Sequence, residues 1–263
     1  MSSFPLKISL ITVSFNSVKT IKETLLSVSQ QDYSHVEYIV IDGGSTDGTI
    51  DVIEAFKHHI HTFVSEPDEG LYDAMNKGIR YATGDVVGFL HSDDIFSHSN
   101  VISQIMATFQ NSENDACYGD LIYFSQSPDK VVRYWRSSDF VPGLFKKGWN
   151  PPHPTFYVRK NIYEKYGVFD TTYSMGNDIE LMMRFLEKNR IKSVYLPHIL
   201  VKMRLGGISN RQVKGIIEQN KNILRAARNL GVPIFPLTFF GYKLLNRIAQ
   251  FFQKPGRVCH HVK

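Results

Sequence analysis

Apolar runs alternate with segments of helical spacing along the first ninety residues. Each mainly apolar run is typical of a buried strand, and the segment that follows it places apolar residues on one face of a helix. The expected strands are Ile8–Val13, Glu37–Ile41, Ile60–Val64 and Asp85–Leu90, and the expected helices are Val18–Gln30, Thr49–Phe56 and Leu71–Ala82. This alternation predicts right-handed βαβ units and a parallel sheet covered by helices.

Beyond residue 90 the alternation is lost, and the expected strands become short and irregular. Residues 141–154 are rich in Pro, Gly and Trp and predict a long loop, which is often a functional element. The strands expected here are Ala116–Gly119, Leu121–Phe124, Val131–Trp135, Phe156–Val158 and Ser193–Leu196, and the helices are Val101–Phe109, Asp178–Lys188, Arg211–Leu230 and Thr238–Gln253. We therefore expect an α/β fold with a mixed, mainly parallel sheet and a helical C-terminal tail.

The composition is that of a globular protein of one or two domains. The chain has 263 residues, of which 43% are hydrophobic and 21% are charged, so disorder, collagen and a coiled coil are excluded as the whole structure. Its two cysteines, Cys117 and Cys259, cannot form a disulfide framework, and neither has the spacing of a zinc site. A reducing compartment is the simplest interpretation.

The net charge of +5 comes from the C-terminal tail. Residues 219–263 carry eight basic and no acidic residues, whereas residues 1–218 carry 22 basic and 25 acidic residues. A basic tail rich in Phe and Leu points to a membrane surface rather than to nucleic acid. No signal peptide is recognisable, and Asn229–Tyr242 is too short to span a bilayer. We expect a cytoplasmic protein, soluble or peripheral at the inner face of the cytoplasmic membrane.

The last expected helix has two distinct faces. One face is polar, and it carries Lys243, Asn246, Arg247, Gln250, Gln253 and Lys254. The other face is apolar, and it carries Phe240, Leu244, Leu245, Ile248, Phe251 and Phe252. This division suits a helix lying on anionic lipid, and it equally suits a helix packed on the core. The charge asymmetry of the tail favours lipid.

Polar residues collect where the expected parallel strands end. Ligands of open α/β sheets bind at this edge, and Ser14, Asp42 and the pair Asp93-Asp94 stand there. Adjacent carboxylates suit Mg²⁺ or Mn²⁺ together with substrate phosphates, although a solvated turn that caps the next helix explains them equally well. Asp42 suits a contact with a base or ribose, or an Asx-turn that opens the loop 43–48. That loop is neither a Walker motif nor GxGxxG.

The second half offers four further candidates. Asp178 opens an expected helix, where a carboxylate is either a cap or the general base for an attacking hydroxyl, and Glu180 is the second candidate base. His153 lies between prolines of the long loop and either contacts an acceptor or a diphosphate or has no function. Arg204 precedes Gly206-Gly207, which suits a loop closing over phosphates or a simple Gly-rich connection.

Several motifs together resemble glycosyltransferase family 2, an inverting family with the GT-A fold. The resemblance runs from about Ile8 to Ser209 and is closest to enzymes of bacterial polysaccharide and O-antigen (lipopolysaccharide) synthesis. The motifs that carry it are Ser14-Phe15-Asn16, the segment 39–49 around Asp42-Gly43-Gly44-Ser45, the segment 65–78 (SEPDEGLYDAMNKG), Phe89-Leu90-His91-Ser92-Asp93-Asp94 and Gly206-Gly207. His91 stands where the family usually has Asn, and Asn177 where it commonly has Glu.

The resemblance implies roles for individual residues. Asp42 would contact the base, Asp93 the ribose or sugar, and Asp94 a Mn²⁺ or Mg²⁺ ion. Asp178 would be the catalytic base. The nucleotide-sugar site would also include Ser14 and, from the segment 65–78, Asp73 and Lys77.

The interpretation of the whole chain follows. Residues 1–210 would form one GT-A domain, with a nucleotide-sugar half over about 1–100 and an acceptor half over about 101–210, and residues 211–263 would form a basic helical region. The enzyme would transfer a hexose or N-acetylhexosamine from a UDP-sugar to a hydroxyl of a polyprenyl-diphosphate-linked glycan in bacterial surface polysaccharide synthesis.

Two other classes stay open. A sugar-1-phosphate nucleotidyltransferase would carry a Gly-rich, basic phosphate loop, which residues 14–20 lack. A non-catalytic sugar-binding or scaffold protein of an assembly complex would not need Asp94 and Asp178.

Overall fold

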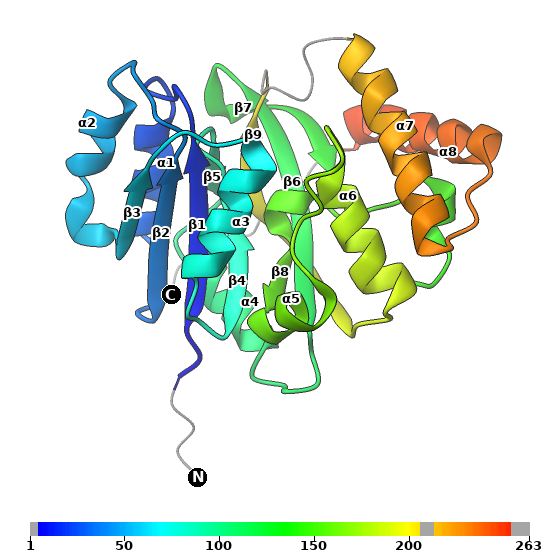
Figure 1. Cartoon of the computed structure of the whole chain (residues 1–263), viewed down its shortest axis with the longest axis horizontal. Coiled ribbons are helices and arrows are strands. Elements are labelled where there is room, and N and C mark those ends of the chain that lie inside the picture. The colour runs from blue at the N-terminus through cyan, green and yellow to red at the C-terminus, as the bar shows by residue number, and fades with distance from the viewer. Residues whose placement is uncertain (1–4, 206–212, 254–263) are drawn as a thin grey trace.

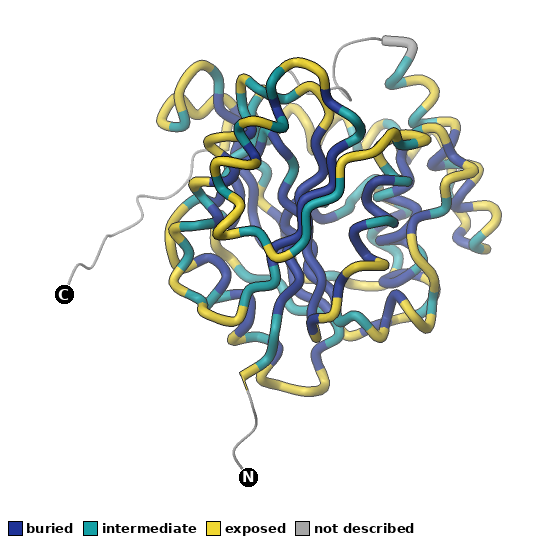
Figure 2. The backbone as a smooth tube through the Cα atoms, turned by 60° about the vertical axis from the view of Figure 1, so that its left-hand side comes forward, coloured by how far each residue is buried: buried dark blue, intermediate teal, exposed yellow. Residues whose placement is uncertain are grey.

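The computed structural model describes residues 5–205 and 213–253 of the chain. One nine-stranded sheet runs through it in the order β3-β2-β1-β4-β8-β6-β9-β5, with β7 paired to β6 (Figure 1). Figure 2 shows the strands as the buried centre of the molecule. Gly206, Gly207 and Lys254, which the sequence singled out, lie outside the described residues.

The first half follows the sequence prediction closely. The strands β1 (Ile8–Ser14), β2 (Val36–Asp42), β3 (Thr62–Ser65) and β4 (Val86–Phe89) are parallel, and the helices between them are α1 (Ile21–Ser29), α2 (Thr49–Glu54) and α3 (Leu71–Tyr81). The register pairs Ser14 with Asp42 and Asp42 with Ser65. The polar residues at the carboxyl ends of β1, β2 and β3 therefore lie side by side.

The second half differs from the prediction in its strands. Two predicted pieces form one strand, β6 (Ala116–Ser125), and β9 (Ser193–Arg204) continues eight residues past Leu196. β9 continues through Pro197 because it pairs with β6 on one side and with β5 (Asp94–Phe96) on the other, with register shifts near Gly119. The strand β5 was not predicted.

The remaining elements complete the second half of the chain. They are α4 (Val101–Thr108), β7 (Ser127–Trp135), the short helices η2 (Leu144–Lys147) and η3 (His153–Thr155), β8 (Tyr157–Arg159), α5 (Lys160–Tyr166), α6 (Asn177–Met182) with its π-helical continuation η4 (Met183–Lys188), α7 (Val213–Leu230) and α8 (Pro236–Phe252). The strand β8 is antiparallel to both β4 and β6, so the sheet is mixed. The helix α5 was not predicted.

Two apolar cores cover the two faces of the sheet. Residues of α1, α2 and α4 pack on one face around Leu10 and Val40. Residues of α3, α5, α6 and α7 pack on the other face around Ile11 and Ile39, together with Phe239 of α8. Successive residues of one strand therefore pack into opposite cores, because their side chains point to opposite faces of the sheet.

The tail helices are attached to this second core. Figure 1 shows α7 and α8 beside α6 at one end of the sheet. The buried residues Ile223 and Ala227 of α7 and Phe239 of α8 join the core, whereas much of the apolar side of α8 faces solvent. Leu244 is 61% exposed and Phe252 is 81% exposed. The helix is therefore packed on the domain and still presents an apolar surface.

The contact between α3 and β1 gives a stability prediction. A Cβ atom added at Gly78 would lie 2.4 Å from Cγ2 of the buried Ile11. Overpacking of this kind typically costs about 1–3 kcal/mol, so Gly78→Ala should lower the free energy of unfolding by that amount. Gly241→Ala is the matched control, because Gly241 is also helical and has open space around its Cα. The control should stabilise the protein by roughly 0.5–1 kcal/mol. Urea unfolding measures both changes in the free energy of unfolding. If the two substitutions changed it in the same direction, the tight contact at Gly78 would be contradicted.

Candidate active site

Asp42 organises the carboxyl edge of the first three strands. Its carboxylate is fully buried and accepts hydrogen bonds from the hydroxyls of Ser14 (2.9 Å), Ser45 (2.6 Å) and Ser65 (2.9 Å). The backbone amides of Gly44 (3.1 Å) and Ser45 (2.8 Å) donate to it as well. Ser14, Asp42 and Ser65 therefore form one network that fixes the loop after β2. This is the Asx-turn arrangement, and it holds the edge where a nucleotide would bind.

The adjacent carboxylates Asp93 and Asp94 lie in different environments. They follow β4 in a turn closed by the amide of Asp94, which donates to the carbonyl of His91 (3.0 Å). Asp93 is partly exposed, and its charge reaches the ring of His91. Asp94 is fully buried, neither of its side-chain oxygens has a hydrogen-bond partner, and burial raises its pKa well above the ordinary value.

The two carboxylates differ in what they offer a cation. Both Asp94 oxygens are buried and lack a protein partner, and a bound cation would satisfy them. Asp93 is the partly exposed member of the pair. The assignment of the cation to Asp94 stays a prediction. Among the described residues, no three His, Cys, Asp or Glu side chains are grouped so as to hold an ion unaided.

Asp178 lies at the start of α6, partly exposed to the cleft. The hydroxyl of Tyr72 on α3 donates to its Oδ1 (3.1 Å). Burial by the surrounding protein raises the pKa of Asp178, and hydrogen bonds from the Ile179 amide and from Tyr72 oppose this rise. A carboxylate with a raised pKa that keeps one oriented oxygen is suited to act as a general base. Glu180, the other candidate, is bound by Arg184 through both oxygens (2.9 and 3.0 Å) and is buried, so it is not available.

Two stacked histidine rings line the same cleft. His91 and His153 have ring centroids 5.8 Å apart, and His153 also stacks on Phe89 and meets the edge of Phe169. Burial lowers the pKa of His153 to about 4, and burial together with His153 lowers the pKa of His91 to about 4. Both rings are therefore neutral at neutral pH, so His153 would meet a diphosphate as a hydrogen-bonding group and not as a cation. The charges of Asp93 and Asp178 both act on His91, so these two carboxylates lie near the same ring.

The other candidate residues are bound to protein partners. Lys77 lies within 4 Å of the carboxylates of Glu66, Asp68 and Asp73, and these partners raise its pKa. It therefore braces the loop before α3. Asp73 also accepts a hydrogen bond from the Glu69 amide. The structure thus gives Asp73 and Lys77 a role in holding this loop next to the Asp42 network.

Arg204 is similarly engaged at the end of β9. Its guanidinium donates to Glu23 of α1 (2.6 Å) and lies 4.8 Å from the ring centroid of Phe124. It thereby ties α1 to the sheet.

Sequence reasoning missed Tyr72 as a hydrogen-bond partner of Asp178. Tyr72 lies within the motif of residues 65–78, but nothing in the sequence shows that α3 and α6 meet, since the two residues are 106 positions apart. It also missed that Lys243 of α8 comes within electrostatic reach of Asp178. Burial and Arg247 lower the pKa of Lys243 to about 8, and the charge of Asp178 opposes this. Only the docking of α8 brings this cation near Asp178.

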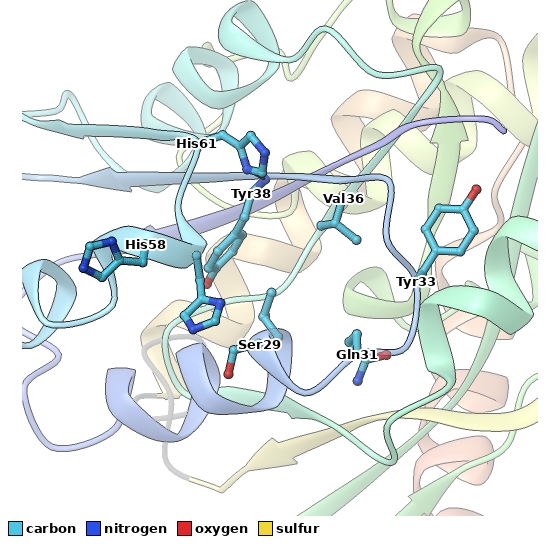
Figure 3. Close-up of a pocket in the computed structure, with 9 residues that line it drawn as sticks. Ser29, Gln31, Tyr33, Val36, Tyr38, His58 and His61 are labelled. Atoms are coloured by element: carbon cyan, nitrogen blue, oxygen red, sulfur yellow. Dashed lines mark hydrogen bonds between the residues drawn. The ribbon is translucent and has the colours of Figure 1, made fainter. Parts of the chain in front are cut away.

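A separate hollow lies at the amino end of β2, at the opposite edge of the sheet. It is bordered by the end of α1 and by His58, His59 and His61 (Figure 3). His61 accepts a hydrogen bond from the Tyr38 amide (3.2 Å), and Figure 3 shows the rings of His58 and His61 well separated. The histidines therefore do not converge, and this hollow is distinct from the candidate active site.

Comparison with known proteins decides the family. The sequence model described as Glycosyl transferase family 2 matches residues 9–179, which is more than half of the chain. The chain belongs to this family. An uncharacterized glycosyltransferase of Mycobacterium tuberculosis (strain ATCC 25618 / H37Rv) is 33% identical to this chain over 189 residues, covering 70% of each protein. The PGL/p-HBAD biosynthesis glycosyltransferase of the same strain is 28% identical over 208 residues, covering 77% of this chain and 78% of that protein.

Solved structures of glycosyltransferases share the fold of this family 2 protein. TarS 1-349 of S. aureus in complex with UDP-GlcNAc aligns with a TM-score of 0.68 at 18% identity, over 94% of this chain and 73% of that one. The chain spans 44% of the longer TarS chain. Mannosyltransferase PcManGT from Pyrobaculum calidifontis in complex with GDP-Man and Mn2+ aligns with a TM-score of 0.64 at 17% identity, covering 94% and 74%. The predicted GT-A fold is confirmed.

The contact between Tyr72 and Asp178 gives a pH prediction. Tyr72→Phe keeps the ring near Phe169 (centroids 5.5 Å apart) and removes one donor to the charged base, so the pKa of Asp178 should rise further. The acid limb of the kcat profile should move to higher pH by about 0.5–1 unit, since a hydrogen bond contributes roughly 0.5–1.5 kcal/mol and one unit is about 1.4 kcal/mol. The KM for the donor should not change. His91 and Lys243, whose charges also couple to Asp178, are unaltered.

Tyr33→Phe is the control for this measurement, because the Tyr33 hydroxyl donates to the Leu6 carbonyl (2.6 Å), away from the cleft. It should leave the profile in place. An unchanged profile in Tyr72→Phe would show that Asp178 does not take the proton.

Proposed function

We propose that this family 2 protein transfers a hexose or N-acetylhexosamine from a UDP-sugar to an acceptor hydroxyl with inversion at the anomeric carbon. The observation that carries the proposal is the position of Asp178. A partly exposed carboxylate with a raised pKa, oriented by Tyr72, borders the same cleft as the Asp93-Asp94 turn and the two neutral histidines. A base and a cation ligand facing one cleft are what a single displacement at a nucleoside diphosphate sugar needs.

The donor is assigned to about residues 1–100. The network of Ser14, Asp42 and Ser65 pre-forms the edge that receives the nucleotide, and Lys77 with Asp73 braces the adjoining loop. The solved TarS structure in complex with UDP-GlcNAc has the same fold and supports a nucleotide sugar as the donor. PcManGT in complex with GDP-Man shows that this fold also receives another nucleotide. We assign UDP on the resemblance to polysaccharide enzymes.

The residues of the cleft fit a divalent cation that is shared with the donor. Mg²⁺ and Mn²⁺ commonly bind through one or two carboxylates plus substrate phosphates, and Asp94 is a buried carboxylate with two unpartnered oxygens, next to the partly exposed Asp93. When bound there, a cation offsets the charge that develops on the departing diphosphate. The complex of PcManGT with GDP-Man and Mn2+ supports this choice of ion.

The chemistry then needs one proton acceptor. Asp178 takes the proton of the acceptor hydroxyl as its oxygen attacks the anomeric carbon, and the bond from that carbon to the diphosphate breaks on the opposite face. Inversion follows from this single in-line displacement. The raised pKa of Asp178 brings the base closer to the operating pH, where general bases are most effective.

The acceptor is assigned to residues 101–210 together with α7 and α8, and we infer a polyprenyl-diphosphate-linked glycan. The relative named for PGL/p-HBAD biosynthesis and the resemblance to polysaccharide enzymes support a surface glycan. The exposed apolar side of α8, including Leu244 and Phe252, supports peripheral contact with the inner face of the cytoplasmic membrane. Within the described ranges, the structure contains no helix long and apolar enough to cross a bilayer.

A panel of UDP-, GDP- and dTDP-sugars tests the proposal directly. Release of UDP that depends on an added glycan acceptor supports sugar transfer. If none of the donors is consumed with any acceptor, the proposal fails, and the result favours a non-catalytic sugar-binding or scaffold protein.

Asp178→Asn should abolish transfer while leaving donor binding unchanged. The amide has nearly the shape of the carboxylate but cannot take the proton, and general-base catalysis typically contributes about 10²–10⁴-fold. Turnover and the UDP dissociation constant should be measured together. Asp170→Asn is the matched control, because Asp170 only caps the turn at Thr172 (2.9 Å). Near-normal turnover in Asp178→Asn would remove the base assignment.

Asp93→Asn and Asp94→Asn should separate the two carboxylates. In the presence of UDP, Asp94→Asn should weaken Mn²⁺ binding by at least about tenfold, because a charge-assisted ligand whose oxygens have no protein partner is lost. Asp93→Asn should weaken it less, because Asp93 is assigned to the ribose or sugar. Paramagnetic resonance of free Mn²⁺ measures both. The reverse order would move the cation to Asp93.

A further inference from the structure

The corner between α7 and α8 has a fixed shape. Gly231 follows α7 with a φ of 72°, and its amide donates to the Arg228 carbonyl (3.1 Å). The next amide, of Val232, donates to the Ala227 carbonyl (2.8 Å). These two bonds are the Schellman arrangement, which ends a helix and sets an apolar contact beside it. Two prolines restrict the rest of the connection to α8, so the corner is pre-formed.

This corner encloses a hollow of about 270 Å³. Its lining residues are apolar except for Arg228. The apolar ones are Leu224, Ala227, Val232, Pro233, Ile234 and Pro236. An apolar cavity of about 150 Å³ is enough to bind benzene, so this hollow has room for part of a hydrocarbon chain. Arg228 lies in the last turn of α7 and is exposed, which puts a positive charge at the rim.

An exposed apolar surface continues from the hollow along α8. Phe235, directly before the helix, is 72% exposed, and Leu237 in its first turn is 90% exposed. Three further exposed apolar residues share the side of Leu237, because they follow it at helical spacing. They are Leu244, Ile248 and Phe252. We call Phe235 and these four residues of α8 the apolar stripe.

The opposite side of α8 is held by the domain. Phe239 is buried, and the Lys243 ammonium donates to the side-chain oxygen of Asn220 on α7 (2.8 Å). The side-chain oxygen of Gln250 accepts a hydrogen bond from Arg133 of β7 (2.6 Å). With its inner side fixed at both ends, the helix cannot turn the apolar stripe toward the domain. The stripe is therefore a surface for a partner.

The charged residues next to this surface are basic. Lys221, Arg225 and Arg228 follow one another on one exposed side of α7, and Arg228 also borders the hollow. From residue 219 onward the sequence has no acidic residue. A second copy of the chain would bring equal charges together here, whereas an anionic partner complements them. Apolar and anionic groups side by side are the properties of a phospholipid surface.

We propose that the corner between α7 and α8 is a binding site for an anionic phospholipid, with one acyl chain in the hollow and its phosphate at Arg228. The apolar stripe lies on the surrounding bilayer at the headgroup boundary, and the basic side of α7 faces anionic headgroups. The inference rests on the proposed function for the membrane as partner and adds a defined lipid site to it. The membrane would then meet the end of the molecule opposite β3 (Figure 1).

Calorimetric titration with dihexanoyl phosphatidylglycerol, kept below its micelle concentration, tests the site in the full-length protein. The wild type should bind this lipid. Leu224→Gln puts an amide into the hollow and should weaken binding by about tenfold, because the buried contact with the acyl chain is lost. Arg228→Gln should weaken it by about fivefold, which is the contribution of one basic residue near an anionic lipid. Arg228→Lys should retain the affinity within about twofold.

Leu26→Gln and Lys22→Gln are the matched controls. Both residues are exposed on α1, which packs on the other face of the sheet. Both variants should bind the lipid as the wild type does. The urea midpoint of each variant shows whether its fold is intact, and if Leu224→Gln is unfolded, the two Arg228 variants decide the test.

Sedimentation with phosphatidylglycerol vesicles tests the apolar stripe. Leu244→Ser should lower the partition coefficient by about three- to tenfold, because an exposed leucine no longer enters the bilayer. Leu26→Ser should leave it unchanged. Vesicles of phosphatidylcholine alone should retain less protein, and added salt should weaken retention by phosphatidylglycerol, because the basic side of α7 is screened.

Three outcomes would overturn the proposal. The first is that the wild type binds glycerol 3-phosphate as tightly as dihexanoyl phosphatidylglycerol, which would make the site one for free phosphates. The second is that neither Leu224→Gln nor Arg228→Gln weakens lipid binding. The third is a dimer in sedimentation velocity that Leu244→Ser dissociates without any change in vesicle retention, since a second copy would then cover the stripe. These readouts are independent of sugar transfer in the donor panel, so either proposal can fail alone.

Discussion

The hydrogen-bonded carboxylate of Asp42 is the interaction on which the carboxyl edge of β1, β2 and β3 depends. It joins the ends of three parallel strands, because Ser14 belongs to β1, Asp42 to β2 and Ser65 to β3. A buried charge is unfavourable unless hydrogen bonds satisfy it, and here three hydroxyls and two backbone amides do so. The network makes the edge rigid before any ligand arrives. A pre-formed edge loses less conformational freedom when the donor binds.

The surroundings of Asp178 are built on a different principle, since their parts come from distant segments. Asp178 lies on α6, its hydrogen-bond partner Tyr72 on α3, and the nearby cation Lys243 on α8. Each group is placed by the packing of a whole helix and not by a local turn. The helix α8 leaves many of its apolar residues exposed, whereas its Lys243 is bonded to Asn220 of α7.

The sequence predicted what depends on local periodicity and missed what depends on tertiary pairing. The βαβ alternation and the position of Asp42 at the carboxyl end of a strand could be predicted, because apolar runs and turn residues are local signals. The strand β5 was not, because three residues form a strand only when β9 pairs with them. Asp93 and Asp94 could not be distinguished, since neighbouring side chains point to opposite sides of an extended chain and the sequence does not say which side is the core. The pairing of Glu180 with Arg184, four residues on, was a readable signal.

The pairing of β9 also has a consequence for how the chain folds. The Ser97 hydroxyl at the end of β5 donates to the Ile199 carbonyl, 102 residues later, and the parallel neighbour β6 is similarly remote. Contacts at such separation form only after a large loss of chain entropy, whereas the first βαβ units close over a few tens of residues. During synthesis the edge formed by β1, β2 and β3 can therefore assemble before β9 is available. The strand β5, which directly follows Asp93, pairs with β9 only afterwards, so the sheet is completed last at the strand beside this carboxylate.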